Sequence, residues 1–98
     1  MIAGYATSKH LLEDRSDRLI GIATTVGFGE ITYKRKLAKG IGWAVFTDTG
    51  VMLVTDIHDS FIVTMYLVSM KQASAIFGGE IPVDLFEIIK RNQKKGLC

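Results

Sequence analysis

Three β-favouring runs separated by short polar turns constrain the fold of this chain more than any other feature. The runs are Ile41 to Thr47, Val51 to Ile57 and Phe61 to Val68. They are separated by Asp48-Thr49-Gly50 and His58-Asp59-Ser60, and short polar turns of this kind join antiparallel neighbours. The runs therefore predict an antiparallel β-meander.

One helix is predicted before the meander. Thr7 or Ser8 can provide its N-cap, and Gly21 is expected to end it after about Ile20. Residues 21 to 30 contain three glycines and are predicted to form a loop. The chain is thus expected to enter the meander from a helix and a glycine-rich connection.

Two helices are predicted after the meander. Ser69 can cap a short helix through Phe77, and the glycine pair that begins at Gly78 is expected to end it. Pro82 suits the start of a final helix that reaches about Lys95. The basic residues in the last turn of that helix suit the negative end of its dipole.

These elements define an α+β fold class. Residues 31 to 36 alternate apolar and polar side chains, so they are predicted to add a fourth strand. The expected fold is an antiparallel β-meander of three to four strands with one N-terminal helix and two C-terminal helices. A length of 98 residues suits a single domain, residues 1 to 98, rather than two.

The last strand of the meander is apolar on both of its faces. One set of alternating side chains is Phe61, Val63, Met65 and Leu67, and the other is Ile62, Tyr66 and Val68 beside Thr64. Short helices are expected to cover one face, which leaves the other for a homodimer or for another protein. The alternative is that the loop at residues 21 to 30 folds over the second face and leaves a monomer.

Composition excludes several classes of protein. The net charge is +2, and the single cysteine, Cys98, cannot form an intramolecular disulfide, which fits a cytoplasmic location. No apolar run is long enough to span a bilayer and no signal peptide is apparent, so no membrane association is expected. The two histidines, His10 and His58, show no zinc-ligand spacing, so no metal or other cofactor is expected.

Two segments carry a resemblance to a known family. In the segment from Ser8 to Arg18, the matching positions are His10, Leu12, Glu13 and Arg18. This segment resembles the first helix of small phage- and mobile-element-associated proteins of the barnase–EndoU–colicin–RelE-like nuclease group. Val63-Thr64-Met65-Tyr66 is similar to the threonine-containing strand that ends the sheet of that group. The resemblance covers roughly residues 8 to 68.

The resemblance implies cleavage of RNA through its 2′-hydroxyl group without a metal. It implies that His10 is the general acid or base, that Arg18 holds the phosphate and that Thr64 orients the scissile group. One of Lys34, Arg35 or Lys36 is implied to hold the phosphate with Arg18, and Arg15 is a further candidate for substrate binding. Arg15 follows Asp14, which stands where an arginine is common in the group.

Other interpretations of these residues and of the whole chain stay open. The spacing of His10, Asp14 and Arg18 is also typical of a solvated helix face, and Thr64 also suits a strand by propensity alone. The first functional hypothesis is a toxin-like or phage-associated ribonuclease. The second is a non-catalytic phage-encoded inhibitor that binds a host enzyme or defence complex, and the third is a homo-oligomeric accessory protein.

Overall fold

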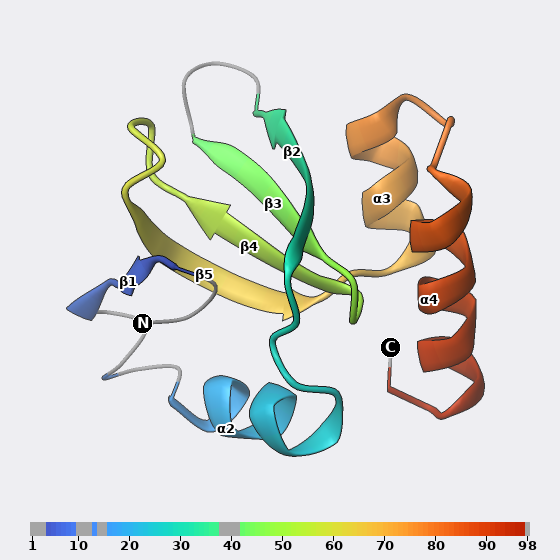
Figure 1. The fold of residues 1–98 in the computed structure, drawn as a ribbon, viewed down its shortest axis with the longest axis horizontal. Coiled ribbons are helices and arrows are strands. Elements are labelled where there is room, and N and C mark those ends of the chain that lie inside the picture. The colour runs from blue at the N-terminus through green and yellow to red at the C-terminus, as the bar shows by residue number, and fades with distance from the viewer. Residues whose placement is uncertain (1–3, 10–12, 14–15, 38–41, 98) are drawn as a thin grey trace.

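The computed structural model describes residues 4–9, 13, 16–37 and 42–97 (Figure 1). Its elements, in chain order, are β1 (Ala6–Thr7), α2 (Ser16–Thr25), β2 (Ile31–Lys36), β3 (Trp43–Thr47), β4 (Val51–Thr55), β5 (Phe61–Leu67), α3 (Met70–Phe77) and α4 (Val83–Lys94). The predicted α+β class is confirmed. Among the described residues, no helix has the length and apolar character that crossing a membrane requires.

The five strands form one sheet in the order β1-β5-β4-β3-β2. Strands β2 to β5 are antiparallel neighbours, which confirms the predicted meander in its four-stranded form. β1 adds a fifth strand that runs parallel to β5 and pairs only Ala6 with Phe61 and Thr7 with Ile62. A two-residue strand is too short to produce an alternating sequence pattern, so the prediction lacked this pairing.

The predicted end of the first helix is wrong. α2 continues through Gly21 to Thr25, and the N–H of Gly27, at φ 75°, donates to the carbonyl of Ile22 just beyond it. Ile22 is buried in the core, and this packing outweighs the weak helix propensity of Gly21. The predicted loop therefore begins after Thr25. Residues 10–12 and 14–15 of the predicted helix lie outside the described residues.

The turn between β4 and β5 is wider than predicted. The Asp56 carboxylate accepts hydrogen bonds from the backbone N–H groups of Ser60 and Phe61, at 2.6 Å and 3.0 Å. These bonds end β4 at Thr55, so Ile57 lies in the turn instead of the predicted strand. At the other end of the meander β3 begins at Trp43, and the predicted start at Ile41 lies outside the described residues.

The alternation predicted for the last strand fails at a bulge in β5. Thr64 pairs with Val54, but the next pair is Ile62 with Thr55, so Val63 is an extra residue. Ile62 and Met65 consequently lie in the same core cluster, although the predicted alternation placed them on opposite faces.

Both faces of the sheet are covered by the chain itself. The α2 face is covered by α2 and the following loop, and its buried residues are Tyr5, Ile22, Val45, Val51, Leu53, Ile62 and Met65. Val26 and Phe28 of the loop pack against this cluster, as the alternative to a homodimer required. The loop therefore covers part of the apolar face inferred from the sequence, whereas Phe61 and Val63 of β5 stay exposed.

The α3–α4 face is covered by the two C-terminal helices, which lie together on one side of the sheet (Figure 1). Its buried residues are Ala44, Phe46, Met52, Val68, Ala73, Leu85 and Ile89. The predicted caps of α3 are confirmed. Ser69 and Gln72 form a reciprocal capping box, and Gly78 ends the helix in the left-handed conformation at φ 64°. Pro82 precedes α4 as predicted.

Candidate functional site

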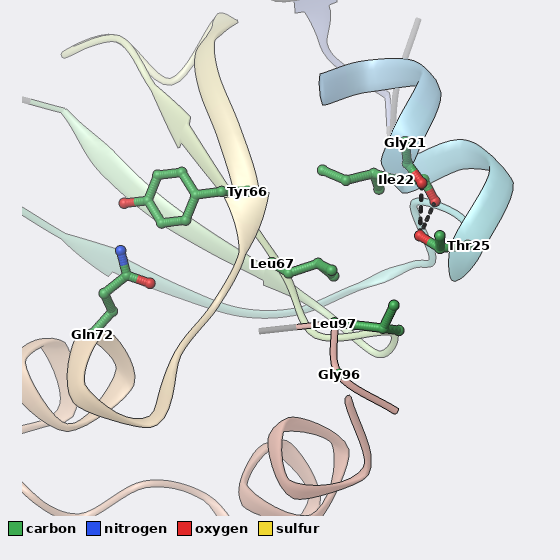
Figure 2. Close-up of a pocket in the computed structure, with 8 residues that line it drawn as sticks. All are labelled: Gly21, Ile22, Thr25, Tyr66, Leu67, Gln72, Gly96 and Leu97. Carbon is green, nitrogen blue, oxygen red and sulfur yellow. Dashed lines mark hydrogen bonds between the residues drawn. The ribbon is translucent and has the colours of Figure 1, made fainter. Parts of the chain in front are cut away.

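A hollow of about 780 Å³ lies where α2, the end of β5, the start of α3 and the C-terminal segment meet (Figure 2). The residues that line it are Gly21, Ile22, Thr25, Tyr66, Leu67, Gln72, Gly96 and Leu97. Ile22 and Leu67 belong to the α2 face of the sheet, whereas Tyr66 packs on the α3–α4 face. The hollow therefore reaches both faces at the end of β5.

One part of the hollow is apolar and another is polar. The side chains of Ile22, Leu67 and Leu97 lie near one another, and those of Tyr66 and Gln72 lie apart from them (Figure 2). The Gln72 Oε1 atom accepts hydrogen bonds from the backbone N–H and the hydroxyl of Ser69, at 3.0 Å and 3.1 Å. The capping box thus fixes the orientation of the Gln72 amide. A volume of this size and mixed lining suit a flat ligand with a polar edge.

Thr64 lies on the α3–α4 face of the sheet and is half-buried. It pairs with Val54, and the same row continues through Ala44 to Arg35 in β2. Tyr66, two residues further along β5, projects from the same face and lines the hollow. Thr64 therefore shares its face with the hollow-lining Tyr66 and with one cation of the predicted basic run.

The structure divides the predicted basic run between the two faces. Lys34 pairs with Val45 and Lys36 pairs with Trp43, so both point to the α2 face, opposite Arg35. The Arg35 guanidinium lies 4.9 Å from the centre of the Phe77 ring on the α3–α4 face. The three cations therefore do not converge on one phosphate position.

The side chains of the remaining predicted site residues lie outside the described part of the structure. His10 and Arg15 lie outside the described residues. Arg18 belongs to α2, and its side chain lies outside the described part of the chain. The catalytic role of His10 and the phosphate-binding roles of the two arginines stay predictions.

Lys34 is part of a polar cluster that the sequence analysis missed, the Asp59 network, made of Tyr5, Lys34, Thr55 and Asp59. The Asp59 carboxylate accepts from the Lys34 ammonium at 2.6 Å, from the Tyr5 hydroxyl at 3.0 Å and from the Thr55 hydroxyl at 2.8 Å. Asp59 adopts φ 54°, which is uncommon for a residue with a side chain. The Lys34 ammonium is therefore already bonded to the Asp59 carboxylate within the protein.

The Asp59 network shifts the pKa values of its members. Desolvation raises the pKa of Asp59, but the hydrogen bonds from Lys34, Thr55 and Tyr5 outweigh it and hold that pKa below its ordinary value. The hydrogen bond to Asp59 raises the pKa of Lys34, and burial raises the pKa of Tyr5. At neutral pH these shifts keep Asp59 ionised, Lys34 charged and the Tyr5 hydroxyl protonated, as the network requires.

The sequence signals for these features were weak. Lys34 and Asp59 are 25 residues apart and Tyr5 and Asp59 are 54 residues apart, and no local pattern links such positions. Tyr66 lies in the segment that carries the nuclease resemblance, but nothing assigned it a role. Gln72 was detectable only as the partner of the Ser69 cap.

Comparisons with known proteins add no further assignment. Among the described residues, no group of three or more His, Cys, Asp or Glu side chains is placed to hold a metal ion. No family model, no curated protein and no solved structure matches this chain.

Proposed function

We propose that this protein is a toxin-like or phage-associated ribonuclease that acts on RNA in the cytoplasm without a metal. The observation that carries the proposal is the hollow at the end of β5. It is bordered by α2, the helix that follows the His10 segment, and by Tyr66, which shares a strand and a face with Thr64. α2 and β5 therefore border one hollow, with α2 on one face of the sheet and the Tyr66 and Thr64 side chains on the other.

The chemistry would proceed by attack of the RNA 2′-oxygen on the adjacent phosphorus. A general base removes the 2′-hydroxyl proton, the new P–O bond forms, and the 5′-oxygen leaves with a proton from a general acid. His10 would supply one of these two proton transfers, because its pKa ordinarily lies near neutrality. Arg18 would hold the charge that develops on the phosphate. Thr64 lies on the face opposite α2, so an orienting role for its hydroxyl requires the RNA to pass around the end of β5.

The hollow would hold one nucleotide beside the scissile bond. Single-stranded RNA is commonly recognised by splayed-out bases that pack on side chains and hydrogen-bond through their edges. The apolar part formed by Ile22, Leu67 and Leu97 suits the face of a base. The fixed Gln72 amide supplies a polar group for its edge.

A second candidate is a non-catalytic inhibitor that binds a host enzyme or defence complex. The placement of the predicted basic residues favours it. Lys34 is bonded to Asp59, Arg35 lies over Phe77, and Lys36 points to the face opposite Thr64. A protein that binds a partner without cleaving RNA has no need for these cations to converge.

RNA cleavage in the presence of EDTA tests the proposal. We expect the wild-type protein to cleave a fluorescent single-stranded RNA and to leave the same oligonucleotide intact when its 2′-hydroxyl groups are removed. His10→Ala should reduce the rate by about 10²–10⁴-fold, the usual contribution of a general acid or base. Arg18→Ala and Thr64→Val should also slow cleavage.

His58→Ala is the matched control, because His58 is exposed in the turn between β4 and β5. Its rate should equal that of the wild type. Equal losses in His10→Ala and His58→Ala would contradict the assigned role of His10. A wild-type protein that leaves RNA intact would make the inhibitor the leading function.

A further inference from the structure

We propose that the outer face of α4 docks an acidic segment of a partner protein that carries an apolar anchor residue. The outer face is defined by Val83, Phe86, Glu87, Lys90, Arg91 and Lys94, which border one surface hollow. All six side chains come from α4. The inference does not depend on RNA cleavage.

The outer face points away from the core. Leu85, Ile89 and Asn92 turn toward the sheet and are at most 3% exposed. At 100° per residue, Val83 projects from the opposite side of the helix and Phe86 from its flank. Val83 is 73% exposed and Phe86 is 40% exposed, so two large apolar side chains lie in solvent within one turn.

The cations of the outer face follow these apolar residues along the helix. The Lys90 ammonium lies 5.5 Å from the centre of the Phe86 ring, and Arg91 and Lys94 continue toward the helix end. Within the described part of the chain, none of these three cations forms an ion pair. Glu87 is the one acidic member of the face, so the face is net positive.

This arrangement fits a protein segment better than a nucleic acid. A single-stranded nucleic acid would place phosphates on the cations and a base on Phe86, whereas a protein segment also supplies aliphatic side chains for Val83, which is 73% exposed. A segment with one or two apolar anchors followed by Asp or Glu residues complements both parts of the face. Twelve helical residues span about 18 Å, which suits a partner helix of three to four turns.

Binding of designed peptides tests the inference. The probe is a fluorescent amphipathic peptide of about 16 residues, with Leu and Phe on one face and Asp and Glu beside them. A twin with Lys in place of the acidic residues is the reference. We expect the acidic peptide to bind and the basic twin to bind at least about tenfold more weakly, with an affinity that falls as salt rises.

Two variants of the outer face should weaken the acidic peptide at least about tenfold, Phe86→Ala by removing the anchor contact and Lys90→Glu by reversing a charge. Ile57→Ser and Lys71→Glu alter exposed residues elsewhere and should bind like the wild type. All four positions are at least partly exposed, and circular dichroism verifies that each variant is folded.

Three results would overturn the inference. The first is absence of binding by the wild type, and the second is equal binding by the outer-face and control variants. The third is a single-stranded RNA that displaces the peptide and binds Phe86→Ala as well as the wild type, since the cations would then serve phosphate groups. None of these results depends on whether His10→Ala still cleaves RNA, so each proposal can fail without the other.

Discussion

The two faces of the sheet are closed by different kinds of interaction. On the α3–α4 face the cover is apolar, with the Phe77 ring packed against Phe46 and Tyr33 at centroid distances of 5.0 Å and 5.9 Å. On the α2 face one part is covered by α2 and its loop, and another is closed by the Asp59 network. The first face depends on the volume of its side chains, whereas the second also depends on charge.

The Asp59 network also shapes the α2 face. Lys34 belongs to β2 at one edge of the sheet, and Tyr5 precedes β1 at the other. In a flat sheet these two edges would stand about 19 Å apart, because neighbouring strands are spaced by about 4.8 Å. Both side chains nevertheless reach Asp59. Asp59 therefore links the two edges of the sheet across the α2 face.

The largest effect is expected from truncating the α3–α4 core. Phe46 is fully buried, so Phe46→Ala should lower the free energy of unfolding by about 3–5 kcal/mol through lost transfer energy and a residual cavity. Urea denaturation measures it. Phe86→Ala, on the exposed surface of α4, is the matched control and should change stability far less. A loss below about 1 kcal/mol for Phe46→Ala would show that this face tolerates vacant volume.

Two glycine-to-alanine substitutions, one on each side of the molecule, are expected to change the stability of the protein in opposite directions. Gly50 has φ 84°, and a Cβ there would lie 2.6 Å from the Asn92 Nδ2 atom, so Gly50→Ala should destabilise the protein by more than about 1 kcal/mol. Gly21 lies within α2, and a Cβ there meets no atom within 4 Å. Gly21→Ala should therefore stabilise the protein by about 0.5–1 kcal/mol.

Thermal unfolding of the two glycine variants, read against the wild type, distinguishes these cases. A lower melting temperature is expected for Gly50→Ala and a higher one for Gly21→Ala. Equal shifts of the same sign would mean that the close approach of Asn92, whose amide donates to the Thr49 carbonyl at 3.1 Å, does not hold the turn between β3 and β4 against α4.

A further effect concerns the charge of the Asp59 network. Asp59→Asn should cost about 1–2 kcal/mol at neutral pH, because the charged partner of Lys34 is lost and the remaining hydrogen bonds weaken. The folded state lowers the pKa of Asp59, so its contribution is present above the ordinary carboxyl pKa and is lost as pH falls through the lowered value. Urea denaturation between neutral and acidic pH should therefore show a shallower acid decline for Asp59→Asn.

A surface ion pair supplies the control for the Asp59→Asn denaturation experiment. Glu13→Gln removes one partner of the exposed Lys9–Glu13 pair and should change stability by less than about 0.5 kcal/mol.

Asp56 makes its own contribution to the loss of stability at acidic pH. Desolvation raises its pKa, but hydrogen bonds from Phe61 and Ser60 outweigh this and lower it to about 2. An acid decline of equal steepness in the wild type and Asp59→Asn would assign pH sensitivity to other carboxylates.

Elements defined by local chemistry were predictable from the sequence. The Ser69 cap, the left-handed Gly78 and the turn between β3 and β4 each act within a few residues. The end of α2 was not predictable, because Gly21 resembles a helix stop until the burial of Ile22 is known.

The candidate site was predictable only as a pair of elements. The sequence pointed to the first helix and to the strand containing Thr64, and α2 and β5 do contact each other. It did not indicate how Lys34, Arg35 and Lys36 divide between faces relative to Thr64. Nor did it reveal that Lys34 is bonded to a carboxylate from a distant turn, because such contacts depend on the tertiary fold.

The parallel pairing of β1 with β5 has a consequence for the order of assembly. The meander can form from contacts between consecutive segments, whose loop closures cost little entropy. β1 must wait for β5, since its partners Phe61 and Ile62 lie more than half the chain away. During synthesis from the N-terminus, Tyr5 and β1 therefore emerge long before the strand and the carboxylate that receive them. The earliest-made strand is thus among the last to find its neighbour.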